Sequence, residues 1–168
     1  MVVPAELAAG WRGTSPPRDA PVPPGWTWGM AGGPVCDYDR ACDPPQPHGT
    51  PYGGFAWVAV GDGRALILDA ELATVFHADA DGGVIARGGS GAIPAAPGAV
   101  AWRPLEPAAL TLTDGRLFMF DAAFPGAADP TAIAAHDGVG VIALGAGAYL
   151  VEVATTADET DLVRFRRR

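Results

Sequence analysis

From residue 54 onward, short apolar segments alternate with turn residues. Two adjoining segments, Phe55 to Val60 and Arg64 to Asp69, are connected through Gly61-Asp62-Gly63. A two-residue turn at Asp62-Gly63 would pair them as an antiparallel hairpin. Because apolar residues fall on both faces of this hairpin, we expect its strands to be central in a sheet.

The clearest alternation of apolar and polar positions lies between Leu110 and Asp121. A type I′ turn at Asp114-Gly115 predicts a hairpin in which Leu112 faces Leu117 on one apolar side. Further strands are predicted at Thr74 to His77, Val84 to Arg87, Val139 to Leu144, Tyr149 to Thr155 and Leu162 to Arg167. The sequence therefore predicts a mainly β fold, with antiparallel hairpins forming a twisted sheet or sandwich.

Two parts of the chain do not follow the strand pattern. Residues 1–53 hold most of the prolines and three tryptophans, with only two helix-compatible pieces, Pro4 to Trp11 and Asp37 to Cys42. We expect this irregular part, with one or two short helices, to lie on the β-rich part, residues 54–168, within a single domain of residues 1–168. The Gly-, Ala- and Pro-rich stretch from Gly88 to Pro107 predicts a long connection and two sub-sheets.

Composition and charge narrow the function classes. The chain has 168 residues and 49% hydrophobic content, enough for one core. No apolar run reaches the length of a membrane helix, so we expect a cytoplasmic protein without a membrane partner. The net charge of −8 includes four arginines among the last five residues, so the rest of the chain is more acidic still. Such a body repels nucleic acid and suits a basic protein partner, although solubility alone also explains it.

The densest cluster of chemically active residues is Cys36 to Asp43, followed by His48. Its C-x5-C-x5-H spacing does not match a structural zinc site, and a reducing cytosol opposes a Cys36–Cys42 disulfide. The cysteines are therefore interpreted as small buried apolar groups. Without a G-x-S-x-G or comparable nucleophile setting, we expect no catalytic, cofactor-binding or metal-binding residues, and no enzyme. The alternative is a small-molecule-binding or enzymatic β-domain that uses the Cys36–His48 segment.

Several motifs together resemble one known family. Trp11-Arg12-Gly13 followed by Asp37-Tyr38-Asp39-Arg40-Ala41-Cys42 is similar to the W-x-G and D-Y-D-R-A-C elements of the immunity protein 21 family. Its later motifs resemble Val60-Gly61-Asp62-Gly63, Leu117 to Asp121 before Pro125-Gly126, Gly145 to Tyr149, and Asp158-Glu159-Thr160. The resemblance thus extends over nearly the whole chain.

This resemblance implies a mainly β immunity protein, encoded in polymorphic-toxin loci, that binds and neutralises a cognate toxin. The acidity of the chain favours a toxin with a basic, nuclease-like surface. The candidate partner-binding residues are Asp37, Tyr38, Asp39, Arg40 and Asp43, and we expect toxin affinity to depend on the three aspartates. In the alternative interpretation these motifs determine core and turns, with an Asp–Arg pair fixing a loop and a glycine at positive φ.

Overall fold

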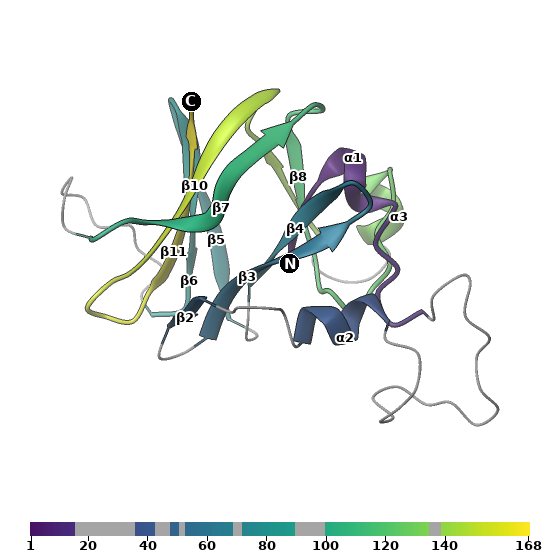
Figure 1. Ribbon diagram of the computed structural model, residues 1–168, viewed down its shortest axis with the longest axis horizontal. Coiled ribbons are helices and arrows are strands. Elements are labelled where there is room, and N and C mark those ends of the chain that lie inside the picture. Colours follow the sequence, from purple (N-terminus) through teal and green to yellow (C-terminus); the bar gives the residue numbers. More distant parts are fainter. Residues whose placement is uncertain (16–35, 43–47, 51–52, 69–71, 90–99, 135–138) are drawn as a thin grey trace. The chain divides into compact units, whose positions relative to one another are not determined.

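Strands predominate in the computed structural model, which describes residues 1–15, 36–42, 48–50, 53–68, 72–89, 100–134 and 139–168 (Figure 1). In chain order the elements are β1 (Val2–Pro4), α1 (Ala5–Ala8), α2 (Asp37–Cys42), β2 (His48–Thr50), β3 (Gly53–Val60), β4 (Gly63–Leu68), β5 (Thr74–Asp79), β6 (Gly82–Arg87), β7 (Arg103–Leu112), β8 (Arg116–Met119), α3 (Pro130–Ala134), β9 (Gly140–Ala143), β10 (Gly147–Thr155) and β11 (Asp161–Arg167). The mainly β prediction is confirmed, and α2 has the predicted bounds. Within these ranges, no helix combines the length and apolar character needed to cross a membrane.

The strands form two sheets. One has six strands in the order β2-β3-β4-β1-β8-β9, and the other has five in the order β5-β6-β11-β10-β7. Every pairing whose register the structure describes is antiparallel. The prediction of two sub-sheets is confirmed, but the Gly88 to Pro107 stretch does not separate them, because β6 and β7 belong to the same sheet. That stretch is also shorter than predicted, since β7 begins at Arg103.

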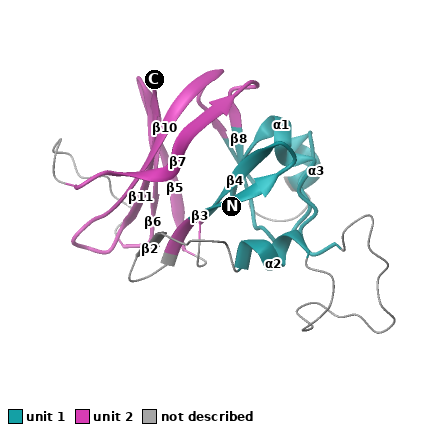
Figure 2. Ribbon diagram, in the orientation of Figure 1, with its two compact units in different colours: residues 1–46, 56–67, 117–141 teal, residues 47–55, 68–116, 142–168 magenta. Residues whose placement is uncertain are grey.

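The chain divides into two compact units, which Figure 2 shows in different colours. Unit 1 comprises residues 1–46, 56–67 and 117–141, and unit 2 comprises residues 47–55, 68–116 and 142–168. Each unit is therefore assembled from three separate segments of the sequence.

The first predicted hairpin is confirmed, with its turn one residue earlier. β3 and β4 are hydrogen-bonded neighbours inside the six-stranded sheet, as their two apolar faces predicted. The residues between them are Gly61 and Asp62, and Gly61 takes the left-handed conformation with φ of 57°. Gly63 belongs to β4, where a Cβ atom would lie 2.4 Å from Leu7 Cδ1. A larger residue there would require the Leu7 side chain of α1 to shift.

The second predicted hairpin, between Leu110 and Asp121, is wrong. β7 and β8 belong to different sheets: Leu112 lies opposite Gly147 of β10, and Phe118 lies opposite Val3 of β1. The Gly115 carbonyl accepts the N–H groups of Leu144 and Gly145, each at 2.9 Å. The Gly115 carbonyl is thus bound to the segment that follows β9. The Asp114-Gly115 dipeptide therefore lies where two distant segments of the chain approach closely, and not in a hairpin turn.

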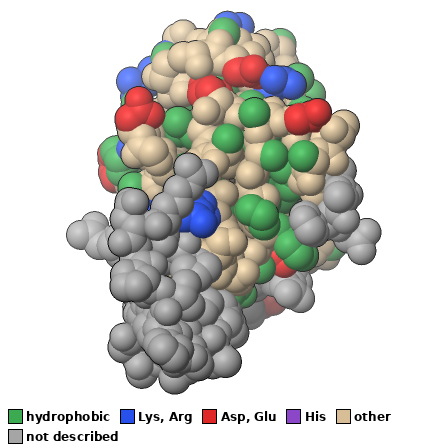
Figure 3. All heavy atoms as spheres, turned by 90° about the vertical axis from the view of Figure 1, so that its right-hand side faces the viewer, with side chains coloured by type: hydrophobic (Ala, Val, Ile, Leu, Met, Phe, Trp, Pro, Cys, Tyr) green, Lys and Arg blue, Asp and Glu red, His purple; other side chains and the backbone are tan. Residues whose placement is uncertain are grey.

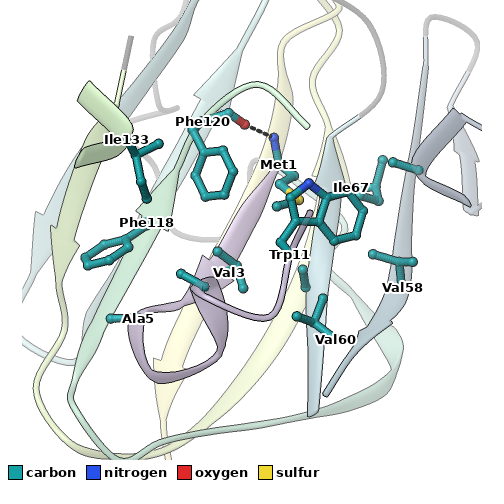
Figure 4. Packing of buried hydrophobic residues seen from close by; sticks show 13 residues of the cluster. Met1, Val3, Ala5, Trp11, Val58, Val60, Ile67, Phe118, Phe120 and Ile133 are labelled. Atoms are coloured by element: carbon teal, nitrogen blue, oxygen red, sulfur yellow. Dashed lines mark hydrogen bonds between the residues drawn. The ribbon is translucent and has the colours of Figure 1, made fainter. Parts of the chain in front are cut away.

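The core of unit 1 surrounds β1 and Trp11 (Figure 4). β1 lies between β4 and β8, with Val2 opposite both Leu66 and Met119. The Met1 amino group donates a 2.6 Å hydrogen bond to the Phe120 carbonyl. The indole N–H of Trp11 donates to the Ala122 carbonyl at 2.8 Å, which satisfies its polar atom inside the core. The sequence alone does not predict β1, because three residues ending in proline carry little strand signal.

The core of unit 2 contains side chains of β6, β10 and β11. Val84, Ala86, Ala154 and Leu162 form a buried cluster, against which Val100 and Trp102 pack. Beside this cluster, Glu152 accepts hydrogen bonds from Arg164 and Arg166, and the Arg164 guanidinium lies 4.2 Å from the Trp102 ring centre. Two of the arginines near the end of the chain, Arg164 and Arg166, thus share one carboxylate within the sheet.

Candidate functional site

The candidate site lies on α2, a helix that is too short to be stable without tertiary contacts. Its first turn is closed by Asp39, whose Oδ2 accepts the backbone N–H of Cys36 at 2.9 Å. This is the side-chain half of a capping box, in which a residue in the first turn reaches back to the N-cap N–H. At the other end, Ala41 is buried in the unit 1 core. Asp39 and Ala41 thus determine where α2 begins and how it is attached.

Asp37 and Arg40 connect α2 to two other segments of unit 1. Asp37 Oδ2 accepts the backbone N–H of Arg12 at 2.8 Å, and its Oδ1 accepts from Arg40 Nη1 at 2.7 Å. Arg40 Nη2 donates to the Ala59 carbonyl of β3. The two side chains are 18% and 38% exposed, so the ion pair by itself adds little stability. Its main effect is to direct charge-assisted hydrogen bonds at two backbone groups.

Tyr38 is attached through its backbone to the Trp11-Arg12-Gly13 element. Its N–H donates to the Gly13 carbonyl at 3.1 Å, and its side chain is half-buried. Gly13 has φ of 57°, and a Cβ atom there would lie 2.3 Å from the Ala123 carbonyl oxygen. Only glycine fits both the conformation and the space at this position.

The segment from Ala122 to Gly126 also binds the Trp11-Arg12-Gly13 element. The Gly126 N–H donates to the Trp11 carbonyl at 2.9 Å, and a Cβ atom at Gly126 would lie 2.0 Å from the Ala8 carbonyl oxygen. The Trp11, Asp37 and Pro125-Gly126 motifs, distant in the sequence, are therefore joined by backbone hydrogen bonds. The sequence alone does not indicate Gly126 as a contact of Trp11, because a glycine carries no signal of which segment it approaches.

The two cysteines of α2 have different environments. Cys36 is buried and Cys42 is exposed, and both are free thiols. Burial raises the pKa of the Cys36 thiol above its ordinary value, so this thiol is protonated at neutral pH. Asp43 and the side chain of His48 lie outside the described residues. In the described part of the chain, no group of three or more His, Cys, Asp and Glu is arranged to hold a metal ion.

Exposed charge in the described part of unit 1 is negative. The exposed residues include Glu6, Asp62, Asp121 and Asp129, whereas the arginines described there, Arg12, Arg40 and Arg64, are half-buried. Hydrogen bonds from the Thr131 backbone and hydroxyl lower the pKa of the Asp129 carboxyl below its ordinary value, which keeps it ionised. Figure 3 shows one face of the molecule, on which acidic and basic side chains both lie among apolar ones.

The later motifs of the sequence determine turns in unit 2. The Tyr149 hydroxyl lies 2.6 Å from the Leu144 carbonyl oxygen and 2.8 Å from that of Gly145. Between β10 and β11, the Thr156 hydroxyl accepts the Thr160 N–H at 2.9 Å, and Glu159 has φ of 65°. These residues hold the ends of strands, as the alternative interpretation of the motifs predicted.

The geometry thus defines a mainly β protein with a short helix, α2, held by its own motif residues. Comparisons with known protein families, curated proteins and solved structures found no match to this chain.

Proposed function

We propose that this protein is an immunity protein that binds a cognate toxin with a basic, nuclease-like surface and thereby neutralises it. The observation that carries the proposal is the sign of the exposed charge: acids are exposed in the described part of unit 1 while its described arginines are half-buried. Opposite surface potentials speed the encounter of two proteins and disfavour wrong partners. An acidic antidote also avoids the nucleic acid that a nuclease-like toxin binds.

The resemblance to the immunity protein 21 family supports the same proposal. Trp11, Gly13, Asp37, Arg40 and Gly126 are the residues that interlock in unit 1. Residues that hold a fold together are those that a family of related domains shares, whatever each member binds. The motif accordingly supports membership of a structural family, and the acidic surface supports the class of partner.

Asp37, Tyr38, Asp39, Arg40 and Asp43 remain the proposed contact residues within that surface. The first four are half-buried on α2, so part of each residue is open to a partner. Contact there would combine charge with the apolar part of the tyrosine, the mixture that is typical of interface hot spots.

The experiment uses the gene next to the one that encodes this chain. The C-terminal domain of its product is expressed in a bacterial host alone, with this chain, and with a variant of this chain. We expect growth arrest by the domain alone, normal growth with the chain present, and a stoichiometric complex by size-exclusion chromatography with light scattering. A domain that arrests growth equally with and without the chain would contradict the proposal.

Asp39→Asn is the variant that separates a binding role from a folding role. Asparagine keeps an oxygen that can accept the Cys36 N–H, so α2 retains its cap, while the negative charge is lost. We expect unchanged thermal unfolding and a weaker affinity for the toxin domain, through faster dissociation, measured by surface plasmon resonance. Asp39→Ala is the matched control, because it removes the cap as well and should also lower stability.

The alternative function, a small-molecule or enzymatic site at Cys36–His48, would require the cysteines to share a cavity. Cys36 is buried with a protonated thiol and Cys42 is exposed, so the two described cysteines give that function no support.

A further inference from the structure

The edge strand β5 leaves one of its sides open to a further strand. β5 ends the five-stranded sheet and, in the described part of the chain, pairs with β6 alone. Two large hydrophobic side chains are exposed among the described residues, and one of them is Val75 of β5, at 47%. The neighbouring His77, Ala78 and Asp79 are exposed as well. β5 is therefore accessible to another protein chain.

The ladder between β6 and β11 shows which backbone groups of β5 point outwards. In an antiparallel ladder, alternate residues direct their N–H and C=O groups to opposite neighbours. The Arg167 N–H donates to the Asp81 carbonyl, so the odd-numbered residues of β6 face β11 and its even-numbered residues face β5. The latter lie opposite odd-numbered residues of β5. The backbone groups of Thr74, Phe76 and Ala78 consequently point away from β6, and no hydrogen bond to them is found within the described residues.

The other edge strands of the two sheets are protected against such pairing. β7 contains Pro104 and Pro107, and its ladder with β10 is irregular. β2 and β9, the edges of the six-stranded sheet, have only three and four residues. β5 has six residues, a continuous register with β6 and no proline. Short edges, prolines and irregular pairing are the features by which natural sheets prevent strand addition, and β5 has none of them.

We propose that β5 pairs with β5 of a second copy of this chain, antiparallel about a two-fold axis at Phe76. This register places Phe76 opposite its counterpart and Thr74 opposite Ala78 of the second copy. All the outward backbone groups of both strands then take part, with about six hydrogen bonds, two for each opposed pair. The Phe76 ring does not obstruct the edge, because it lies over Gly83, where a Cβ atom would be 2.4 Å from its Cζ atom.

The side chains and charges of β5 fit a second copy in this register. On the exposed face, Val75 lies opposite His77 of the second copy, so each exposed valine gains a ring as its cross-strand neighbour. The two Asp79 carboxylates fall near opposite ends of the ladder, about 20 Å apart, where salt screens their repulsion. A shift of two residues would place Val75 opposite Asp79 and lose one opposed pair. Two-fold pairing of one surface with itself is also the commonest form of protein self-association.

The small size of this contact determines its expected strength. One added strand buries less than the roughly 1,200 Å² that a standard stable interface requires, so the dimer should be weak and reversible. We expect sedimentation equilibrium to give a Kd of about 10–500 µM, with the average mass rising from monomer towards dimer as the concentration approaches about 1 mM. This self-association goes beyond the proposed function and does not depend on it.

Ala78→Pro tests the backbone contact. Ala78 is exposed and its N–H points away from β6, so proline removes an outward donor and leaves the ladder with β6 intact. We expect the Kd of the dimer to increase at least about tenfold, with little change in the thermal unfolding midpoint.

Val75→Lys, which places a charge on the same edge, should weaken the dimer in the same way. Val141→Lys is the matched control, because Val141 is 50% exposed and lies on the edge strand β9 of the other sheet. It should alter the Kd less than about twofold.

A covalent cross-link tests the register. Positions 75 and 77 of opposite copies form a non-hydrogen-bonded pair with Cα atoms about 4.5 Å apart, which is within the range of a disulfide. In a Cys42→Ser background, which removes the exposed native thiol, Val75→Cys combined with His77→Cys should give a covalent dimer on mild oxidation. Val75→Cys alone should not, because the two copies of position 75 lie on a diagonal about 8 Å apart.

Three outcomes would overturn the proposal. The first is an unchanged protein that remains monomeric at about 1 mM. The second is a dimer that neither Ala78→Pro nor Val75→Lys weakens, because its interface would then lie elsewhere. The third is a dimer without the cross-link in the double cysteine variant, because its register would then differ. None of these measurements involves the toxin, so the proposed function is tested separately.

Discussion

Gly13 and Gly61 offer a direct test of the close packing around Trp11. Both glycines have φ of 57°, so an alanine at either position meets the same backbone preference. Their surroundings differ: a Cβ atom at Gly61 meets nothing within 4 Å, whereas one at Gly13 would lie 2.3 Å from the Ala123 carbonyl oxygen. The pair separates the conformational role of a glycine from its steric role.

The expected magnitudes follow from this difference. Alanine in the left-handed conformation costs about 1–2 kcal/mol, and about 0.4–1 kcal/mol is recovered because alanine restricts the unfolded chain. We therefore expect Gly61→Ala to lower the free energy of unfolding by about 1 kcal/mol. Gly13→Ala must also displace the Thr14 N–H from Ala123 and the Tyr38 N–H from Gly13. At about 1 kcal/mol for each hydrogen bond, its total loss is about 3 kcal/mol.

Urea unfolding at constant pH, followed by tryptophan fluorescence and circular dichroism, measures both variants. With m of about 2 kcal/mol/M, the midpoint of Gly13→Ala should lie about 1 M below that of Gly61→Ala, with an unchanged slope. Equal losses in the two variants would refute the argument, because the approach of Gly13 to Ala123 would then contribute nothing to stability.

Two further predictions concern other buried groups. Tyr149→Phe removes the hydroxyl beside the Leu144 and Gly145 carbonyls and should lower the free energy of unfolding by about 1–2 kcal/mol in urea; an unchanged midpoint would contradict the role of this hydroxyl. Burial raises the pKa of the Cys36 thiol, so its contribution to stability is complete below the unfolded-state pKa of 9.0 and is lost as the pH rises through the folded-state value. The free energy of unfolding should therefore decrease above pH 9.0, and Cys36→Ala should abolish this component of the decrease; an identical pH profile in the variant would refute it.

Local patterns predicted the strands whose apolar residues are continuous. β6, β10 and β11 coincide closely with predicted segments, because valine, isoleucine and leucine recur there between turn residues. β7 was predicted only in part, since Pro104 and Pro107 conceal its first half. Proline is tolerated there because β7 is an edge strand, and its pairing with β10 is irregular between Leu150 and Glu152.

The pairing of β7 and β8 was not accessible from local sequence. An Asp-Gly dipeptide between alternating segments favours a hairpin, but each strand has a competing partner far along the chain. β10 pairs with β7 and β1 pairs with β8, so two long-range ladders replace one local ladder. A turn signal reports what a short peptide favours, and burial in the whole fold decides which strands meet.

The candidate site shows the same division between local and tertiary information. The bounds of α2 and the Asp37–Arg40 pair follow from residues that are three apart on one helix. The hydrogen bonds from Arg12 to Asp37 and from Arg40 to Ala59 join segments 25 and 19 residues apart, and no local pattern indicates them.

Binding and folding roles on α2 can be separated by considering where charge is compensated. Asp37 is paired with Arg40, so together they contribute little net charge to the field at a distance. The exposed carboxylates of Glu6, Asp62 and Asp121 have greater contact with solvent and dominate that field. Long-range attraction of a basic partner is therefore set by these exposed acids, while α2 acts only after contact. Because exposed charges are screened by salt over about 10 Å, salt should slow association while leaving the dissociation rate, set by α2, nearly unchanged.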